Sequence, residues 1–420
     1  MRTCFRRLSF LEVRRELYRT NVPKNLLLMA NHTYVKNLNE RRILTLLRVE
    51  GQLTRAEVAR RLGLNRSTIT NLVDGLLQRS LLTETDRVTN QADGRDMGRP
   101  GINIALNPSG CYFLGVEIGA DVLRFALLNM ALEVVEKAQI SITPPHTPEK
   151  AAQHISVKLA KYLRDPRYSE KIQSVYVTAP GLVRNDGVVA YAPIAGWRDV
   201  DFLHLLESKL SLPVHLENDA NAAAFGEVYC HPMLVQGLTV FFTLLANGCG
   251  GAVIINDRIL KGSAGLGGDF GHIRVQNDGP ICNCGQRGCL EPLVSLKALQ
   301  EHLDEKAIPK DASPEEIVDC AVDGNASALA ATKHFTHYLA LGLISATNIF
   351  NPNNIILGGL MRPVIEFVLD DLREAVRTGI MPGIPAPSIE LSRNGEYECA
   401  IGVAALAHQA EFDEATIGLA

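Results

Sequence analysis

The feature that most constrains the fold is the alternation of short apolar segments with helical patterns in residues 112–420. These elements form two successive sets, and each set begins with consecutive segments of strand length. The predicted strands are 112–118, 122–128, 132–142, 174–178, 213–216, 239–245, 252–255 and 355–357, and the predicted helices include 296–303, 326–348 and 364–377. Strands that alternate with helices form sheets covered by helices. The sequence therefore predicts an α/β body of two lobes, with a ligand cleft between them beyond the carboxyl ends of the strands.

Composition excludes several other classes of protein. Hydrophobic residues make up 46% and charged residues 21% of the 420 residues, which is ordinary globular usage and not that of a disordered chain. No apolar stretch approaches the roughly 18 residues that a membrane helix needs, and the N-terminus lacks the apolar segment of a secretory signal. The nine cysteines are not the even set of a secreted disulfide framework. We therefore expect a cytoplasmic protein without membrane contact.

Residues 37–108 have the pattern of a helix-turn-helix domain. Thr54 stands three residues before Glu57, which is the spacing of a capping box, and Gly63 stands where the helix that they begin should end in a tight turn. The predicted elements are a helix around 43–47, a second helix from 54, a third helix over 65–79 and wing strands over 81–84 and 102–106. Helix, turn, helix and wing together predict a winged helix-turn-helix domain.

The start of the third helix and the wing loop carry side chains suited to double-stranded DNA. Hydroxyl, amide and guanidinium groups hydrogen-bond to base edges and phosphates, and an Arg in an extended Gly-Arg-Pro segment can enter a narrow minor groove. The predicted DNA-binding residues are Arg66, Ser67, Thr68, Thr70, Asn71, Arg95 and Arg99. The alternative is a small helical interaction domain that binds no nucleic acid.

The charge distribution favours contact between the front of the chain and a polyanion. Residues 1–105 hold 19 Lys and Arg against 10 Asp and Glu, whereas the remainder holds 23 against 36. Residues 1–36 carry no recognisable chemistry and are predicted either as an extra helix or as a leader before a start at Met29. The predicted domains are an N-terminal extension over 1–36, the DNA-binding domain over 37–108 and the two-lobed body over 109–420.

A metal site is predicted where one histidine precedes three closely spaced cysteines. The residues are His272, Cys282, Cys284 and Cys289, in a run that is otherwise polar and rich in glycine. One imidazole and three thiolates complete a tetrahedral Zn²⁺ site and leave no open position for water, so the zinc should be structural. The alternative is that the cysteines lie in this loop incidentally.

A second cluster of polar side chains follows a predicted strand that ends at Leu216. Asn218 and Asp219 stand between this strand and the next helix, at the edge that faces the cleft. Asn and Asp side chains hydrogen-bond vicinal hydroxyls, and an Asp can also accept a hydroxyl proton as a general base. The alternative is that the two residues only cap the helix.

These motifs resemble those of the ROK family (repressors, open reading frames and kinases), over about residues 38–410. The family joins an optional winged helix-turn-helix to a sugar-kinase body of the two-lobed actin-like ATPase fold. Asp269 stands where the family's Glu-x-Gly-His motif usually has Glu. The resemblance implies that His272 serves both the metal and the sugar. The sugar-binding residues that it implies are Asn218, Asp219, Asp269, His272 and Glu291.

The nucleotide side departs from the kinase pattern. Kinases of this family begin with Asp-x-Gly-Gly-Thr, whereas here Glu117 begins the run, Ala120 replaces the second glycine and Asp121 replaces the hydroxyl residue. An added Cβ and an added carboxylate oppose the close approach of a triphosphate. We therefore expect sugar binding without phosphoryl transfer and no catalytic residue, although Asp219 would be the base if the chain were a kinase.

The sequence as a whole predicts a transcriptional regulator of carbohydrate metabolism genes, most simply a repressor, that responds to a sugar. Its expected partners are double-stranded operator DNA, a sugar or sugar-phosphate effector and further copies of itself in a homodimer or homotetramer. One alternative is an ATP-dependent sugar kinase. The other is a regulator controlled by a partner protein instead of a sugar.

Overall fold

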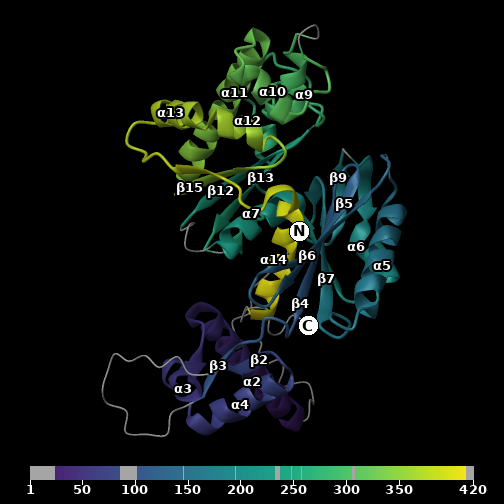
Figure 1. Cartoon of the computed structure of the whole chain (residues 1–420), viewed down its shortest axis with the longest axis vertical. Helices are drawn as coiled ribbons and strands as arrows, with labels where there is room; N and C mark the ends of the chain where they lie inside the picture. Colours follow the sequence, from purple (N-terminus) through teal and green to yellow (C-terminus); the bar gives the residue numbers. More distant parts are fainter. Residues whose placement is uncertain are drawn as a thin grey trace, which may run out of the picture. The chain divides into compact units, whose positions relative to one another are not determined.

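The computed structural model describes residues 24–85, 102–144, 146–193, 195–231, 237–246, 248–256, 258–304 and 308–412, with side chains from residue 34 onward. The chain divides into two compact units, one of residues 1–110 together with 410–420 and one of residues 111–409 (Figure 1). In the described part of the chain, no helix is both long enough and apolar enough to cross a membrane.

In its described residues, the first unit combines three helices with a small antiparallel sheet of order β1-β3-β2. Its elements are α2 (Lys24–Glu50), β1 (Leu53–Thr54), α3 (Arg55–Leu62), α4 (Arg66–Gln78), β2 (Leu82–Thr85) and β3 (Asn103–Leu106). Thr54 and Glu57 form the predicted capping box, and Gly63 ends α3 in the left-handed conformation, with φ +66°. The apolar faces of the three helices meet in a core that includes Ile43, Leu47, Val58, Ile69, Val73 and Leu76. The predicted winged helix-turn-helix is confirmed.

The second unit begins with a lobe built on a five-stranded sheet of order β11-β7-β4-β5-β6, which we call the first lobe. Its strands are β4 (Tyr112–Ile118), β5 (Val122–Asn129), β6 (Val134–Ser141), β7 (Ile172–Ala179) and β11 (Val214–Asn218), and its helices are α5 (Pro148–Arg164) and α6 (Phe202–Lys209). The parallel strands β4, β7 and β11 end side by side, so the residues at their carboxyl ends share one edge. This edge carries Glu117, Asn218 and Asp219.

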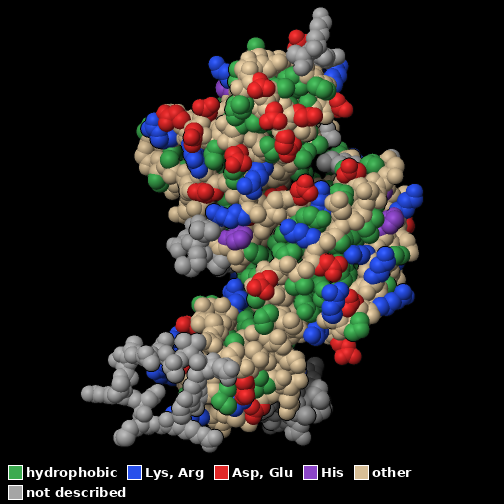
Figure 2. Space-filling view, in the orientation of Figure 1, with side chains coloured by type: hydrophobic (Ala, Val, Ile, Leu, Met, Phe, Trp, Pro, Cys, Tyr) green, Lys and Arg blue, Asp and Glu red, His purple; other side chains and the backbone are tan. Residues whose placement is uncertain are grey.

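The second lobe repeats this plan with a sheet of order β14-β13-β12-β15-β16. Its strands are β12 (Thr239–Leu244), β13 (Cys249–Ile255), β14 (Arg258–Ile259), β15 (Asn354–Gly358) and β16 (Ser388–Leu391). Its helices are α8 (Glu291–Val294), α9 (Leu296–Glu301), α10 (Pro314–Val322), α11 (Ala326–Phe350), α12 (Arg362–Phe367) and α13 (Leu369–Gly379). Figure 2 shows acidic side chains over the helices of this lobe. The predicted two-lobed α/β body is confirmed.

Two helices of the second unit approach each other closely at small residues. They are α7 (Asp219–Cys230), which follows β11, and α14 (Glu398–Phe412), the last helix among the described residues. A Cβ added at Gly402 would lie 1.8 Å from the carbonyl oxygen of Ala222, and one added at Gly226 would lie 2.6 Å from Cα of Gly402. Only glycine permits this approach of the two backbones. The contact places the start of α14 beside α7, whose first turn carries Asp219.

The structure differs from the predicted elements in several places, and three of them bear on the fold of the second unit. The predicted helix over 364–377 is two helices, because Val368 has non-helical dihedral angles (φ −104°, ψ 12°) between α12 and α13. Residues 182–201 form a small sheet that the sequence did not predict, of strands β8 (Leu182–Val183), β9 (Val188–Ala192) and β10 (Trp197–Asp201). The long helix α14 was not predicted either, since its alanine-rich run lacks a clear apolar stripe.

Candidate functional site

A pocket lies between the two lobes of the second unit, at the carboxyl ends of their strands. One wall consists of Asn218, Asp219 and the residues after β7, and the opposite wall consists of the loops that flank β13. The predicted sugar-binding residues Asn218, Asp219, Asp269, His272 and Glu291 all line this pocket. The structure therefore brings together five side chains that are spread over 74 positions of the sequence, from 218 to 291.

Asn218 caps α7 and also fixes the carboxylate beside it. Its Oδ1 accepts the Asn221 N–H (2.9 Å), and its Nδ2 donates to the Gly181 carbonyl (2.7 Å) and to Asp219 Oδ1 (3.0 Å). Both amide hydrogens of Asn218 are therefore engaged within the protein. Asp219 Oδ1 also accepts the Ala220 N–H (2.8 Å), and the residue lines the pocket. Capping and ligand contact, the two alternatives from the sequence, are thus compatible.

The ionisation of Asp219 suits hydrogen bonding to hydroxyl groups at neutral pH. Desolvation in the cleft raises the pKa of Asp219 to about 6, and hydrogen bonds from Ala220 and Asn218 oppose the rise. At pH 7.5 most of the Asp219 side chains are therefore still carboxylates. A carboxylate held by neighbours on one oxygen can accept from vicinal hydroxyls with the other.

The opposite wall of the pocket presents Asp269, His272 and Glu291. Asp269 precedes a short 3₁₀ helix, η1 (Phe270–His272), and its Oδ2 lies 3.5 Å from His272 Nε2. Glu291 begins α8, where its Oε2 accepts the N–H of Cys249 (3.4 Å). Burial raises the pKa of Asp269, and His272 opposes the rise. This wall offers further acceptors for a polyhydroxyl ligand.

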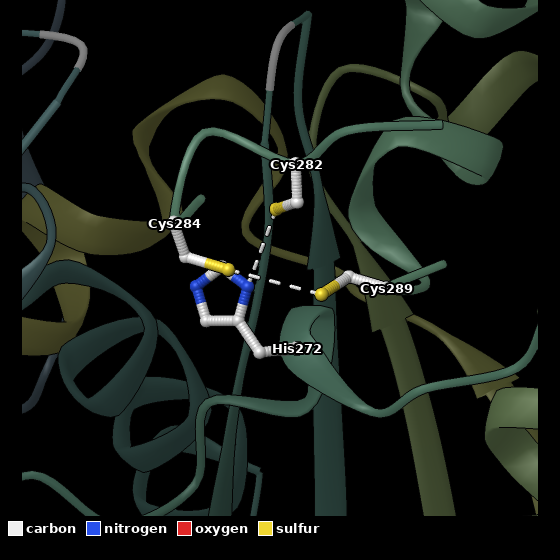
Figure 3. A group of neighbouring side chains, drawn as sticks. All are labelled: His272, Cys282, Cys284 and Cys289. Carbon is white, nitrogen blue, oxygen red and sulfur yellow. Dashed lines mark hydrogen bonds between the residues drawn. The ribbon is translucent and has the colours of Figure 1, made fainter. Parts of the chain in front are cut away.

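His272, Cys282, Cys284 and Cys289 form a cluster that can hold a metal ion (Figure 3). Their ligand atoms all lie within 4.8 Å of one another, with Cys282 Sγ 3.5 Å from His272 Nδ1 and Cys284 Sγ 3.8 Å from Cys289 Sγ. A tetrahedral Zn²⁺ with Zn–S bonds of about 2.3 Å separates its sulfur ligands by about 3.8 Å. The four side chains fit such an ion in both type and spacing.

Glycine gives the metal loop its tight path. Gly288 has φ +75°, and a Cβ at this position would lie 1.5 Å from the carbonyl oxygen of Gln276. The loop also reaches the pocket, because Asn283 and Cys284 line it. Tyr191 of the first lobe donates its hydroxyl to the Asn283 carbonyl (2.9 Å). A metal that orders this loop would therefore also order one wall of the pocket.

The first hairpin of the second unit lies outside the residues that line this pocket. Glu117 pairs there with Arg124 (2.9 Å), and Ala120 and Asp121 follow at the turn. Desolvation raises the pKa of Glu117 to about 7, with Glu398 and Asp219 contributing to the rise and Arg124 opposing it. The hairpin thus combines the carboxyl groups of Glu117 and Asp121 with the single guanidinium of Arg124, a set that does not favour a triphosphate.

A pair of buried carboxyl groups lies behind the pocket, and sequence reasoning missed it. Ser392 Oγ lies 2.7 Å from Glu227 Oε1 and 2.9 Å from Glu398 Oε2, while Glu398 Oε1 accepts the hydroxyl of Thr243 (2.9 Å). A serine hydroxyl has one proton and can donate to only one of the two carboxyl groups. Glu227 Oε1 also accepts the backbone N–H groups of Arg393 (2.7 Å) and Asn394 (2.9 Å). When the serine proton is donated to Glu227, Glu398 can bond to Ser392 only as a protonated carboxyl group.

The pKa of Glu398 agrees with this assignment, because burial raises it to about 7. Glu117 and Asp219 also have raised pKa values, so the folded chain holds protons that the unfolded chain releases between about pH 4.5 and 7. These three groups bind more protons in the folded state in this range, so their contribution to stability rises as the pH falls from 7 towards 5, while His215 and His334, whose pKa values burial lowers, act in the opposite direction. Each group contributes at most about 1.4 kcal/mol per pH unit.

Glu398→Gln should flatten this pH dependence. The amide of Gln imitates the protonated carboxyl group, because it can donate to Ser392 and accept from Thr243. We expect the variant to be at least as stable as the wild type at pH 8 and to gain less stability on acidification to pH 5. Urea unfolding at several pH values measures both effects. The exposed Glu396→Gln is the matched control and should keep the wild-type slope; the same slope in Glu398→Gln would show that Glu398 is not protonated.

The start of α4 presents the predicted DNA-binding side chains of the first unit. Asn65 caps α4 by accepting the Thr68 N–H (2.7 Å) and also accepts the Ser67 hydroxyl (2.8 Å), and the Thr70 hydroxyl donates to the Arg66 carbonyl (2.9 Å). Arg66 and Asn71 are exposed beside them. Arg95 and Arg99 lie outside the described residues. The roles of all seven residues in DNA binding stay predictions.

Comparisons with known proteins agree with this architecture. The model of the ROK family matches residues 113–410, and that of the MarR family matches residues 36–95. The xylose repressor of Bacillus spizizenii is 28% identical over 381 residues, which cover 90% of this chain and 97% of the relative. A glucokinase of Halalkalibacterium halodurans is 28% identical over 294 residues, which cover 65% of this chain and 87% of the relative.

Solved structures give the same two groups of neighbours. A ROK family transcriptional regulator, described as a homologue of the E. coli MLC protein, aligns with a TM-score of 0.75 at 24% identity and covers 91% of this chain and 98% of its own. A ROK family glucokinase from Streptomyces griseus, solved with glucose and AMPPNP, aligns with a TM-score of 0.62 at 28% identity and covers 71% of this chain and 99% of its own. The regulator accounts for both units, whereas the kinase accounts for only the second.

Proposed function

Because the chain belongs to the ROK family, we propose that it is a transcriptional repressor whose binding to operator DNA responds to a sugar. The observation that carries the proposal is that one chain joins a winged helix-turn-helix to a pocket lined by five polar side chains suited to hydroxyl groups. Two relatives named xylose repressor span 90% and 84% of this chain. Such a protein acts where the chromosome is, which in bacteria is the cytoplasm.

Control by a sugar needs only a difference in sugar affinity between two states of the protein. Asp219 on one wall of the pocket and Asp269, His272 and Glu291 on the other could contact one ligand at the same time. A sugar that bridges both walls favours the closed arrangement of the lobes. We propose that this arrangement has lower affinity for the operator. A symmetric dimer or tetramer would place two recognition helices on one palindromic operator.

The cysteine and histidine cluster is proposed to hold one structural Zn²⁺. Three cysteines and one histidine fill the four positions of a tetrahedral ion, so no position remains for a reacting water. The ion would hold Asn283 and Cys284 at the pocket and orient His272. The proposed contribution of zinc is therefore to the shape of the sugar site.

A sugar kinase remains the second candidate, because glucokinases resemble the second unit and Asp219 stands where a general base would be needed. Two features favour the regulator. Ala120 adds a Cβ to the first hairpin, and Asp121 adds a carboxylate, at the positions where the Asp-x-Gly-Gly-Thr pattern has Gly and Thr. Phosphoryl transfer depends on neutralising phosphate charge, which these residues oppose.

Arg66→Ala should weaken DNA binding by about 1–3 kcal/mol, because an exposed Arg at the start of a recognition helix contacts bases or phosphates. The probe is a duplex selected from a random library by the full chain, and fluorescence anisotropy at about 0.15 M salt measures affinity. Arg167→Ala, which removes an exposed Arg from the second unit, is the charge-matched control. Unchanged affinity in Arg66→Ala would contradict the assignment of α4.

The same assay tests the whole proposal when sugars are added to the complex. D-xylose and D-glucose, the sugars suggested by the relatives, are the first probes. We expect one of them, or a related sugar in a wider panel, to release the wild-type protein from DNA. If the full chain selects no duplex from the library, the proposal that it is a repressor is wrong.

A further inference from the structure

A glycine-rich loop connects the two walls of the pocket. We call residues 260–269, which follow β14, the glycine loop. Gly265, Leu266, Gly267 and Asp269 of this loop line the pocket. Although the loop belongs to the second lobe, the carbonyl oxygen of Ala264 accepts the N–H of Asn185 in the first lobe (3.4 Å). The loop therefore lies against both lobes. Because Asp269 is its last residue, the position of the loop sets the position of Asp269 at the pocket.

The strongest contact between this loop and the first lobe is an ion pair. Lys261 Nζ donates to Oε2 of Glu217, the second-last residue of β11. The Glu217 side chain is 11% exposed, whereas that of Lys261 is 42% exposed. A carboxylate that is mostly buried depends on its partners more than a surface carboxylate does, because removal of a partner leaves its charge poorly solvated.

The other oxygen of Glu217 holds the residues of the opposite wall. Glu217 Oε1 accepts the backbone N–H of Asn218 (3.0 Å) and the side-chain amide of Asn221 (3.1 Å). Asn218 in turn donates to Asp219 Oδ1 (3.0 Å). One carboxylate thus joins the glycine loop, which carries Asp269, to the first turn of α7, which carries Asp219.

Glu217 itself does not line the pocket, so any effect on a ligand must pass through its neighbours. We propose that Glu217 and Lys261 are positioning residues of the sugar site, and that their ion pair sets the distance between the wall with Asp219 and the wall with Asp269. The part of this proposal that concerns a sugar ligand rests on the proposed function. The geometric part, in which the ion pair orders the glycine loop, does not depend on the identity of the ligand.

The geometric part is tested in the full chain without ligand by hydrogen exchange. The Gly267 N–H donates to the Lys261 carbonyl (2.9 Å), so its exchange reports on the order of the loop. We expect faster exchange at Gly267 in Glu217→Gln and in Lys261→Met. Lys158→Met, which breaks a pair with Glu136 (3.6 Å) elsewhere in the first lobe, is the matched control. Unchanged exchange at Gly267 in both variants would overturn the proposal.

The functional part is tested with D-xylose or D-glucose, whichever raises the melting temperature of the wild type. We expect each single variant to bind that sugar about tenfold more weakly, and the double variant Glu217→Gln, Lys261→Met to bind it no more weakly than the poorer single variant. Lys261→Arg keeps the charge and should restore affinity to within about twofold. Zinc content should be the same in all variants.

The outcomes separate this proposal from the proposed function. If no sugar of the panel binds the wild type, the sugar assignment fails and hydrogen exchange still decides whether the pair orders the loop. If exchange at Gly267 becomes faster while sugar affinity stays at the wild-type value, the positioning role is wrong. If Lys261→Arg binds as poorly as Lys261→Met, the ion pair is not the cause.

Discussion

Cys289→Ser should carry much less than one zinc ion per chain and should unfold at a lower temperature than the wild type. Cys289 is 2% exposed and lies within 4.8 Å of the other three ligands. A serine hydroxyl does not replace a thiolate as a zinc ligand, so the binding energy of the ion no longer favours the folded state. Free zinc at about 1,000 times its dissociation constant would stabilise the wild type by about 4 kcal/mol.

For a unit of this size, the loss of that stabilisation lowers the melting temperature by roughly 5–10 °C. Metal analysis and differential scanning calorimetry measure the two effects on the same samples. Cys320→Ser is the matched control, because Cys320 on α10 is a partly exposed cysteine outside the cluster. Sugar affinity should fall in Cys289→Ser as well, since Asn283 and Cys284 line the pocket. A zinc-free variant with the wild-type melting temperature and sugar affinity would refute the site.

The features that the sequence predicted correctly depend on residues close together in the chain. The capping box of Thr54 and Glu57 and the turn at Gly63 are local, and so is the alternation of strands in each lobe. The convergence of five polar side chains on one pocket was also expected, because the strand end after Leu216 predicted it for Asn218 and Asp219, and the resemblance to the ROK family implied it for the other three. Their contacts with a sugar stay a prediction.

The features that the sequence did not predict depend on packing between distant segments. Glu227 and Glu398 are 171 positions apart, and nothing in either local pattern indicates that Ser392 joins them. Glu217 and Lys261 are ordinary charged residues in the sequence, and only the approach of the glycine loop to β11 makes them a pair. The end of α12 at Val368 likewise lacks a Gly or Pro signal.

Asp219→Asn distinguishes a regulator from a kinase. Asn keeps the Oδ1 that accepts from Asn218 and Ala220 and replaces Oδ2 with an amide, so the fold of the first turn of α7 should persist. Above the pKa of about 6, the wild-type side chain is ionised, and a charge-assisted hydrogen bond to a sugar hydroxyl contributes about 1.5–3 kcal/mol. In a regulator, the variant should therefore bind sugar roughly 10- to 150-fold more weakly, and it should require correspondingly more sugar to leave the operator.

The two functions differ in what the wild type does with ATP and Mg²⁺. A regulator yields no sugar phosphate above background, because Glu117, Ala120 and Asp121 disfavour the triphosphate. A kinase yields sugar phosphate, and its Asp219→Asn variant loses turnover even at saturating sugar, since the loss of a general base acts on the transition state. Calorimetric titration of the sugar and a coupled phosphorylation assay, each on the wild type and the variant, give the four values needed. Asp121→Asn, which lies outside the pocket, is the control and should keep wild-type sugar affinity. Turnover by the wild type that disappears in Asp219→Asn would show that the altered hairpin still accepts a nucleotide.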